Sequence, residues 1–522
     1  MEKETYHILI VDDHQMFIDG IHSLLIGQNK FQISHEANNG EDALDILAKH
    51  QVDILISDLN MPGMSGLETL SRIKAIKPNL PVVMITKSEE EYIMEEAIGS
   101  KIADYLIKPL NPNQILLSVK RILENKRLVS ERTNISFQQG FRDLNYSINN
   151  FPNWEEWCEI YKQLVYWELE MEQTGNKSMS QVLDNQKEEA NSGFGKYIEE
   201  QYETWIKDET KDRPVLSHEL MKNYVLPHVS NDIPTYFVLI DNLRYDQWKI
   251  IEPIVAEFFE VEKEDMFFSI LPTTTAYSRN SIFSGMTPLE MSEKYPQLWV
   301  GDDVEEGKNN FEEEWSRIQL KKQGLRDLKF SYQKIKHVSE GKALVDSINN
   351  IKNNHLNVIV YNFVDMLSHA RTDMAMIREL APDESAYRSI TKSWFEHSPL
   401  LEALELISKN KCKVIISTDH GTIRVQKPIK ILGDRNTNTN LRYKTGKNLN
   451  YKGDKLLDSG HPSNFMLPSA NLTSRFVFAK EDRFFVYPNN YNHFVNYYKD
   501  TFQHGGISLE EVIIPVISLN SR

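Results

Sequence analysis

Two sets of polar residues, one in each half of the chain, have the types and spacing of sites for phosphate chemistry. The N-terminal set is Asp12, Asp13, Asp58, Thr86 and Lys108. The C-terminal set is Asp241, Thr275, Asp365, His369, Asp419, His420 and His504. Carboxylates alone suit hard cations, and carboxylates with imidazoles suit transition metals. Together the sets predict a phosphorylation-controlled regulator whose output is a metal-dependent hydrolase.

The N-terminal set predicts a phosphoacceptor. Three carboxylates, from Asp12, Asp13 and Asp58, would bind Mg²⁺, which keeps several of its waters. With its charge screened by the metal, Asp58 can attack a phosphoryl donor as a nucleophile. Thr86 and Lys108 are placed to bind the added phosphate.

The C-terminal set predicts a pair of metals. Its six nitrogen and oxygen ligands are too many for one tetrahedral ion, and they divide into two three-ligand sites, each with an open position. Two metals about 4 Å apart activate the attacking oxygen and stabilise the leaving oxygen of a phosphoryl transfer.

A nucleophile is expected in the segment LPTTTAYSRNSIFSG, Leu271–Gly285. A threonine hydroxyl needs a neighbouring base or metal to become reactive, and three threonines are present: Thr273, Thr274 and Thr275. Ser278, Arg279 and Asn280 follow, and they can donate hydrogen bonds to phosphate oxygens. Arg244 either binds substrate phosphate or pairs with a local carboxylate such as Asp246.

Short apolar strands alternate with helical stretches over the first part of the chain. The expected strands are HILIV, FQISHEA, VDILISD, PVVMIT and IADYLIK, and the expected helices are Gly40–His50, Gly66–Ile76, Glu89–Ser100 and Asn113–Lys126. This alternation predicts a doubly wound α/β domain, residues 1–126, with its site at the carboxyl ends of parallel strands. The acidic residues fall at those ends.

Residues 127–230 form an expected helical connector. Aromatic and apolar residues recur there at helical spacing: Trp154, Trp157, Tyr161, Leu164, Trp167 and Met171, then Phe194, Tyr197, Ile198, Tyr202 and Trp205. We expect these side chains to pack a helical bundle.

Residues 231–522 form an expected large α/β domain. Its expected strands are PTYFVLID, FFSIL, LNVIVYNFVD, KVIISTD, RFVFAK, FFVY and VIIPVIS. A long polar loop, Gly433–Gly460, is either a substrate loop or mobile. It carries a basic and aromatic tract that could attract a polyanion: Arg435, Arg442, Tyr443, Lys444, Lys447, Tyr451 and Lys452.

Size and composition set outer limits. At 522 residues the chain exceeds the size of one hydrophobic core, and its net charge of −16 argues against wrapping nucleic acid. With two distant cysteines, Cys158 and Cys412, the metal ligands must be Asp and His. No apolar run approaches the roughly 18 residues that span a bilayer, and no signal peptide is evident. We expect a cytoplasmic protein.

The first 125 residues resemble response-regulator receiver domains. The resemblance rests on the acidic pair, Asp58 with the following LNMPGMSG run, Thr86, and the Lys108–Pro109 pair. It implies phosphorylation of Asp58 by a histidine kinase, Mg²⁺ as cofactor, and a switch in which Thr86 and an aromatic near Tyr105 respond. A phosphorylation-dependent homodimer is the expected consequence.

Residues 234–519 resemble the alkaline phosphatase superfamily and, within it, PglZ-type domains. Five segments match in order: Asp241–Arg244, Pro272–Thr275, Asp365–His369, Asp419–Gly421 and His504. The resemblance implies one zinc on Asp365, His369 and His504, a second on Asp241, Asp419 and His420, and Thr275 as nucleophile. Its Pro-Thr-x-Thr segment is similar to that of the phosphodiesterase branch, with oligonucleotides or cyclic nucleotides as substrates.

The whole chain resembles PorX-type response regulators. That resemblance implies type IX secretion and gliding as the regulated processes, and a sigma factor or secretion-motor protein as partner. An alternative is a zinc-binding but catalytically silent output domain that docks such a partner. A DNA-binding output fits poorly, because no helix-turn-helix with basic residues is present.

Overall fold

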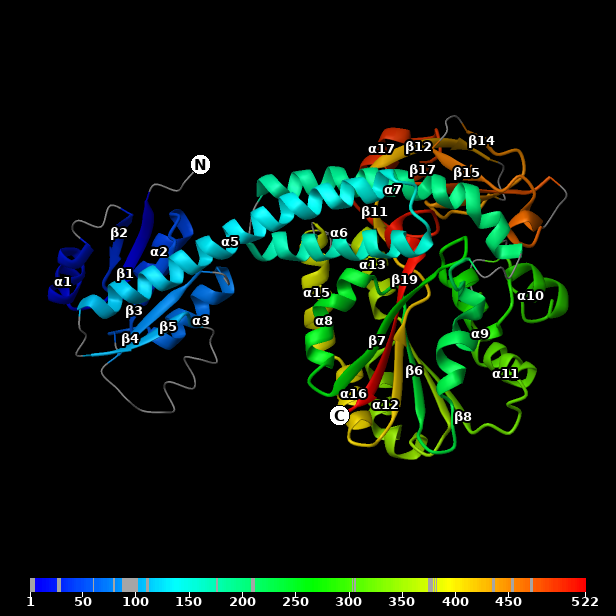
Figure 1. Cartoon of the computed structure of the whole chain (residues 1–522), viewed down its shortest axis with the longest axis horizontal. Coiled ribbons are helices and arrows are strands. Elements are labelled where there is room, and N and C mark those ends of the chain that lie inside the picture. Colours follow the sequence, from blue (N-terminus) through cyan, green and yellow to red (C-terminus); the bar gives the residue numbers. More distant parts are fainter. Residues whose placement is uncertain are drawn as a thin grey trace. The chain divides into compact units, whose positions relative to one another are not determined.

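The computed structural model describes residues 5–522 except 26–29, 60, 78–79, 87–101, 109–111, 175–176, 208–211, 303, 305–306, 374–378, 380, 382, 434–436, 452–454 and 470–472. The chain divides into two compact units, residues 1–138 and 139–522 (Figure 1). Among the described residues, no helix has the length and apolar composition needed to cross a membrane.

The first unit is built on a parallel five-stranded sheet in the order β2-β1-β3-β4-β5. Its strands are β1 (Tyr6–Val11), β2 (Phe31–Ala37), β3 (Ile54–Asp58), β4 (Val82–Thr86) and β5 (Asp104–Ile107). Its helices are α1 (Gln15–Leu25), α2 (Gly40–Lys49), α3 (Gly66–Ile76) and α5 (Pro112–Asn149), which continues into the second unit. The predicted doubly wound fold is confirmed. The helix expected at Glu89–Ser100 lies outside the described residues.

Alternating side chains of these strands form two cores, one on each face of the sheet. Ile8, Ile56 and Ile85 pack with residues of α1 and α5, and Leu9 and Met84 pack with residues of α2 and α3. Burial on both faces explains the continuous apolar runs of the sequence. It also fixes the polar ends of β1 and β3 at one edge.

The second unit contains a six-stranded sheet in the order β7-β19-β10-β6-β9-β8, in which β19 is antiparallel to both of its neighbours. The strands are β6 (Thr235–Ile240), β7 (Phe259–Phe268), β8 (Phe330–Ile335), β9 (Leu356–Tyr361), β10 (Lys413–Ser417) and β19 (Ile513–Ser521). Every residue of β6, β9 and β10 is buried, as expected for strands covered on both faces. The predicted large α/β domain is therefore confirmed, although the strand expected at FFSIL ends at Phe268.

Helices cover both faces of this sheet (Figure 1). On one side lie α9 (Asn280–Ser284) and α11 (Glu312–Lys322), with α10 (Pro288–Lys294) beyond them; on the other lie α8 (Tyr245–Val255), α12 (Val338–Ile351), α15 (Glu384–Glu396) and α16 (Pro399–Ser408). Helix α13 (Phe363–Asp373) follows β9 almost directly, and α18 (Leu509–Val512) leads into β19. Both sit at the end of the sheet where the polar segments gather.

The connector region consists of the end of α5 and of α6 (Trp154–Thr174) and α7 (Lys177–Lys207). Trp157 packs edge-on against Phe194 at 5.5 Å, and Phe194 packs against Phe268 of β7 at 5.9 Å. The backbone N–H of Leu271 donates to the hydroxyl oxygen of Tyr202 at 2.8 Å. The aromatic residues thus pack as predicted, but they join the helices to the α/β part of the same unit.

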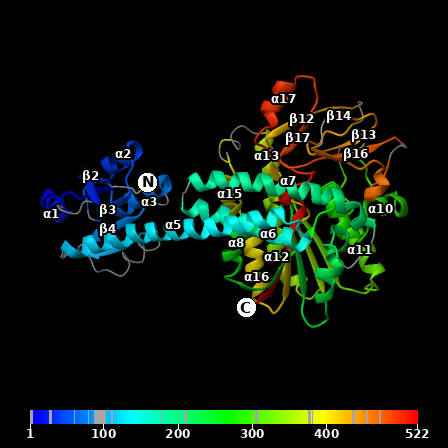
Figure 2. The same ribbon diagram turned by 45° about the horizontal axis from the view of Figure 1, so that its top comes forward.

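Three small sheets lie together at one end of the main sheet, as Figures 1 and 2 both show. They are formed by β11 (Ile423–Arg424) with β18 (Phe502–Gln503), by β12 (Lys427–Leu432), β14 (Asn450–Tyr451) and β17 (Arg483–Val486), and by β13 (Tyr443–Gly446), β15 (Leu456–Asp458) and β16 (Arg475–Ala479). Helix α17 (Tyr491–Tyr498) accompanies them.

The expectation of a long substrate or mobile loop between Gly433 and Gly460 is wrong for its described part, which contains three of these strands. Its basic tract is not an exposed surface either. Arg442 is fully buried and pairs with Glu511, and Lys444 is 1% exposed. Arg435 and Lys452 lie outside the described residues.

Candidate functional site

The first unit brings Asp12, Asp58 and Lys108 together at the carboxyl edge of its sheet. The Nζ of Lys108 lies 2.9 Å from Oδ2 of Asp12 and 2.9 Å from Oδ2 of Asp58. Both carboxylates are buried, whereas Asp13 is partly exposed and binds Nδ1 of His14 at 2.7 Å. Burial alone would lower the pKa of Lys108, but its hydrogen bonds to Asp12 and Asp58 raise it. Lys108 therefore stays charged between two carboxylates.

These carboxylates fit a hard divalent cation. Asp12, Asp13, His14 and Asp58 each offer one ligand atom, and these atoms lie within 4.8 Å of one another. Oxygen ligands with room for waters are what Mg²⁺ requires.

Thr86 and Tyr105 form the second part of the expected receiver site. Thr86 is fully buried at the end of β4, and a side-chain hydrogen bond joins it to Tyr105 of β5. Burial raises the pKa of Tyr105, and that hydrogen bond partly opposes the shift. Pro109 lies outside the described residues.

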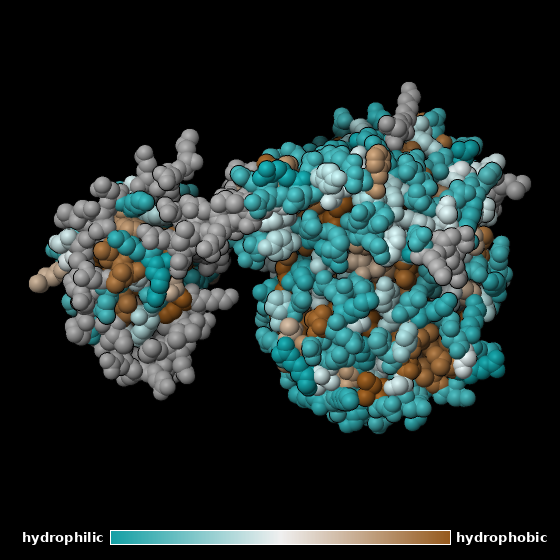
Figure 3. All heavy atoms as spheres, viewed as in Figure 1, coloured by the Kyte–Doolittle hydropathy of each residue, from teal (hydrophilic) through white to brown (hydrophobic). Residues whose placement is uncertain are grey.

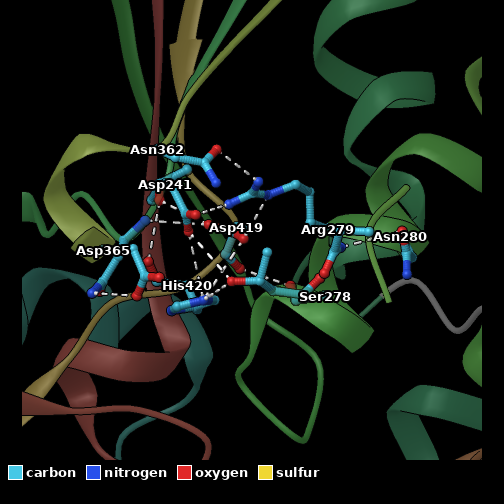
Figure 4. A network of polar contacts seen from close by, with 12 residues as sticks. Asp241, Ser278, Arg279, Asn280, Asn362, Asp365, Asp419 and His420 are labelled. Carbon is cyan, nitrogen blue, oxygen red and sulfur yellow. Dashed lines mark hydrogen bonds and ion pairs between the residues drawn. The ribbon is translucent and has the colours of Figure 1, made fainter. Parts of the chain in front are cut away.

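The second unit brings Asp241, Asp419, His420 and Thr275 together. Figure 4 shows the first three of these residues. Oγ1 of Thr275 lies 3.0 Å from Nε2 of His420 and 3.4 Å from Oδ1 of Asp241. Nε2 of His420 lies 3.7 Å from Oδ2 of Asp419 and 3.9 Å from Oδ1 of Asp241. Because Asp241 follows β6 and Asp419 follows β10, pairing of these two neighbouring parallel strands sets the ends together.

The three threonines have different surroundings. Thr273 donates from Oγ1 to the carbonyl oxygen of Gly506 and accepts from the backbone N of Gly505, each at 3.0 Å. The Oγ1 of Thr274 is buried without a hydrogen-bond partner among the described residues. Thr275 is the one whose hydroxyl contacts His420. It begins a π-helical turn, Thr275–Arg279, that leads into α9.

Asp365 and His504 lie next to this cluster. Oδ1 of Asp365 is 3.4 Å from Nε2 of His504, and the rings of His420 and His504 are stacked with centroids 4.2 Å apart. His369 lies on α13, one turn after Asp365, and its side chain is outside the described part of the structure. Thr275, Asp365 and His504 are half-buried, whereas Asp241, Asp419 and His420 are fully buried. Solvent therefore reaches the cluster on the side of Thr275, Asp365 and His504.

Burial and charge set the protonation of the buried side chains in this cluster. Burial, with the nearby charges of Asp419 and Asp365, raises the pKa of Asp241 well above its usual value. Burial opposes ionisation of Asp419 as well, but Arg279 and His420 hold its pKa below the usual value. Burial lowers the pKa of His420 to about 4, so its imidazole is neutral at pH 7. A neutral imidazole beside two carboxylates is a donor set that zinc accepts.

Arg279 and Ser278, two of the expected substrate contacts, are held by protein groups. Nε of Arg279 lies 3.0 Å from Oδ2 of Asp419, and its NH2 pairs with Asp241 (Figure 4). Oγ of Ser278 donates to the carbonyl oxygen of Asp419 at 2.7 Å. Both side chains are fully buried, so here they support the carboxylates.

Arg244, another expected contact, pairs with Asp246, which is one of the two alternatives that the sequence left open. Its Nε and NH2 lie 2.9 Å and 2.6 Å from the two oxygens of Asp246, and only 2% of its side chain is exposed. The guanidinium thus has a carboxylate partner inside the protein.

Sequence reasoning did not single out three residues that support the site. Asn242 has a left-handed backbone (φ +64) and donates to Oδ1 of Asp365 at 3.4 Å. Asn362 accepts from NH1 of Arg279 at 3.2 Å, and the buried Glu312 pairs with Arg279 at 3.5 Å. The Asp-Asn pair at a strand end was a readable signal for Asn242. Nothing local marks Glu312, which reaches the site from α11.

Three protein families match consecutive parts of the chain. Residues 8–120 match the response regulator receiver domain, residues 127–206 the PorX response regulator linker domain, and residues 220–519 the BREX system PglZ alkaline phosphatase-like domain.

Individual relatives match about a quarter of the chain. The chain is 25% identical over 162 residues to the transcriptional regulatory protein DegU of Brevibacillus brevis, 28% of this chain and 69% of the relative. It is 29% identical over 133 residues to the nitrate/nitrite response regulator protein NarP of Escherichia coli (strain K12), 26% of this chain and 62% of the relative. It is 30% identical over 119 residues to the transcriptional regulatory protein YesN of Bacillus subtilis (strain 168), 23% of this chain and 32% of the relative.

Two of the similar solved structures are receiver domains. The signal receiver domain of an HD domain-containing protein from Pseudomonas fluorescens Pf-5 is 28% identical and covers 23% of this chain and 96% of its own, with a TM-score of 0.22. A response regulator receiver domain protein from Clostridium thermocellum is 26% identical and covers 24% of this chain and 98% of its own, also with a TM-score of 0.22.

Proposed function

We propose that this chain is a response regulator whose output domain hydrolyses phosphodiesters with zinc. The chain belongs to the PglZ family of alkaline phosphatase-like domains, and its PglZ domain follows a receiver domain and a PorX linker domain. The observation that carries the proposal is the contact of the Thr275 hydroxyl with His420 and Asp241. Of the three candidate threonines, Thr275 alone has this contact among the described residues.

Zinc fits the residues present. Asp241, Asp419 and His420 would hold one ion, and Asp365 and His504, with His369 by family resemblance, would hold the other. When bound, the pair would lower the pKa of the attacking hydroxyl and stabilise charge on the leaving oxygen.

In the proposed reaction Thr275 is the nucleophile. Its oxygen attacks phosphorus, the bond from phosphorus to one ester oxygen breaks, and the alcohol leaves with a proton. Water then cleaves the threonine ester, which releases a phosphomonoester and restores the hydroxyl. Arg279 holds Asp241 and Asp419 in place throughout, because its guanidinium contacts both. Linear or cyclic oligonucleotides are the proposed substrates.

We propose that phosphorylation of Asp58 regulates the output domain. A histidine kinase would supply the phosphoryl group, which adds about two negative charges between Lys108 and Thr86. The expected consequence is homodimerisation. A sigma factor or secretion-motor protein as partner, with control of type IX secretion and gliding, belongs to the proposal through the PorX linker match.

Turnover of paired model substrates tests the proposal. Zinc-loaded protein should cleave bis(p-nitrophenyl) phosphate faster than p-nitrophenyl phosphate, and a chelator should abolish the activity. Faster cleavage of the monoester would make the domain a monoesterase. Stoichiometric zinc without cleavage of either ester would favour the docking alternative instead.

A further inference from the structure

A buried carboxylate of the connector joins α6 to helix α15. Oε1 of Glu168 lies 2.7 Å from NH1 of Arg388, and its Oε2 lies 2.7 Å from Nζ of Lys187 on α7. Glu172, one turn later, lies 2.6 Å from NH2 of Arg388. Only 4% of the Arg388 side chain is exposed, so these carboxylates, and not solvent, compensate its positive charge.

The same arginine reaches the segment that carries Asp241. NH1 of Arg388 lies 2.9 Å from Oδ2 of Asp246, and Asp246 forms the two-pronged pair with Arg244. Arg244 stands three residues after Asp241, at the start of α8. Charge-assisted bonds therefore run without a break from α6 to the turn at the end of β6.

Arg244 also packs against the other ligand-bearing strand end. A β-carbon added at Gly421, next to His420, would lie 3.3 Å from Cγ of Arg244. The guanidinium of Arg244 lies 5.6 Å from the ring centroid of Tyr387 and 5.3 Å from that of Phe502. Its position is fixed from several sides.

A second chain of hydrogen bonds starts from the same helix, α15. The hydroxyls of Tyr387 and Ser368 lie 2.7 Å apart, and Ser368 is 3.0 Å from Nδ2 of Asn242. Asn242 in turn donates to Asp365. Adjacent residues of α15, Tyr387 and Arg388, thus support the segments of both predicted metal sites.

We propose that Glu168 and Arg388 are positioning residues of the metal site, and that the connector helix α6 is part of its support. The inference rests on the proposed function, because it takes Asp241 and Asp365 as ligands. Metal ligands keep their geometry only if the residues that contact them are themselves fixed in position. Loss of the carboxylate partner of Arg388 would therefore allow the turn that carries Asp241 to shift. Any signal that moves α6 would reach the ligands by this route.

A matched pair of connector variants tests the inference. Glu168→Gln removes the charge that holds Arg388. Glu199→Gln removes another connector carboxylate that binds a cation of the α/β part, Lys480 at 2.7 Å, in the small-sheet region. Zinc affinity is measured by competition with a chelator, at a temperature where circular dichroism shows every variant folded.

Glu168→Gln should bind zinc about tenfold or more weakly than wild type, and Glu199→Gln should bind it as wild type does. Arg388→Lys should retain more affinity than Arg388→Gln, because a cation remains between the carboxylates. Equal affinity of Glu168→Gln and wild type would overturn the inference while leaving the proposed function intact. Absence of zinc binding by wild type would overturn both.

Discussion

Nε of Arg279 lies 3.0 Å from Oδ2 of Asp419, and neither side chain is exposed to solvent. A buried carboxylate needs a compensating charge, and the planar guanidinium of an arginine has several N–H donors along its edges that can bind more than one acceptor. Arg279 also pairs with Asp241, and the half-buried Thr275 contacts His420. The arginine therefore compensates the charge of these buried carboxylates in the metal-free protein.

Loss of Arg279 should destabilise the protein most when metal is absent. Arg279→Gln leaves Asp241 and Asp419 buried without their cation, which costs about 3–5 kcal/mol. Zinc should recover part of this loss by supplying charge at the same carboxylates. All eight tryptophans lie in residues 139–522, so tryptophan fluorescence during urea unfolding reports on this unit.

Arg317→Gln is the matched control for that measurement. Arg317 is 59% exposed and pairs with Glu313 along α11, so its loss should cost about 0–1 kcal/mol. Equal destabilisation by the two substitutions would contradict the role assigned to Arg279.

Zinc stoichiometry should separate the two clusters. His504→Gln removes a proposed ligand of the Asp365 cluster and leaves Asp241, Asp419 and His420 in place, so bound zinc should fall from two equivalents to one. Elemental analysis after dialysis gives the count. His397→Gln, an exposed histidine on the same unit, should keep two equivalents. Two retained equivalents in His504→Gln would contradict the assignment.

Lys108 should compete with Mg²⁺ for the receiver carboxylates. Its Nζ contacts both Asp12 and Asp58, so Lys108→Ala raises the local negative charge. Mg²⁺ affinity, measured by titration calorimetry, should rise roughly three- to tenfold. Lys77→Ala, a substitution at the C-terminal end of helix α3, should leave the Mg²⁺ affinity unchanged. A weaker affinity in Lys108→Ala would show that the lysine orders the site rather than competing for it.

Lys444 should make stability depend on pH. Burial lowers its pKa to about 7, against about 10.4 in an unfolded chain. Between these values the unfolded state binds a proton that the folded state does not, so stability rises with pH across that window. Below about pH 7 the lysine is charged in both states, and the folded state bears the full cost of burying that charge.

Lys444→Met should therefore be more stable than wild type by about 1–4 kcal/mol at pH 6, and the difference should shrink toward pH 10. Urea unfolding at pH 6 and pH 9 measures it. Lys430→Met is the control, because Lys430 also lies over a tyrosine ring but is exposed. A gain that does not change with pH would contradict the lowered pKa of Lys444.

The sequence predicted those features that local pattern determines. The receiver strands lie within two residues of their expected bounds, because alternation of apolar runs and helical periodicity is a local signal. The gathering of Asp241, Asp365, Asp419 and His504 followed from strand ends meeting at one edge. Two partners of the buried arginines could not be predicted, because they come from helices distant in sequence: Glu312 of α11 pairs with Arg279, and Glu384 of α15 pairs with Arg244. Strand β8 and the strands between Gly433 and Gly460 lack a strong apolar run.

Hydrolysis by Thr275→Ala compared with Thr274→Ala tests the central claim most directly. Both substitutions remove one hydroxyl from adjacent threonines, but only the hydroxyl of Thr275 contacts His420 and Asp241. With zinc-loaded protein, Thr275→Ala should lower diester turnover by on the order of 10³-fold or more, and Thr274→Ala should retain activity near wild type. Comparable activity in wild type and Thr275→Ala would contradict the proposed nucleophile and the function built on it.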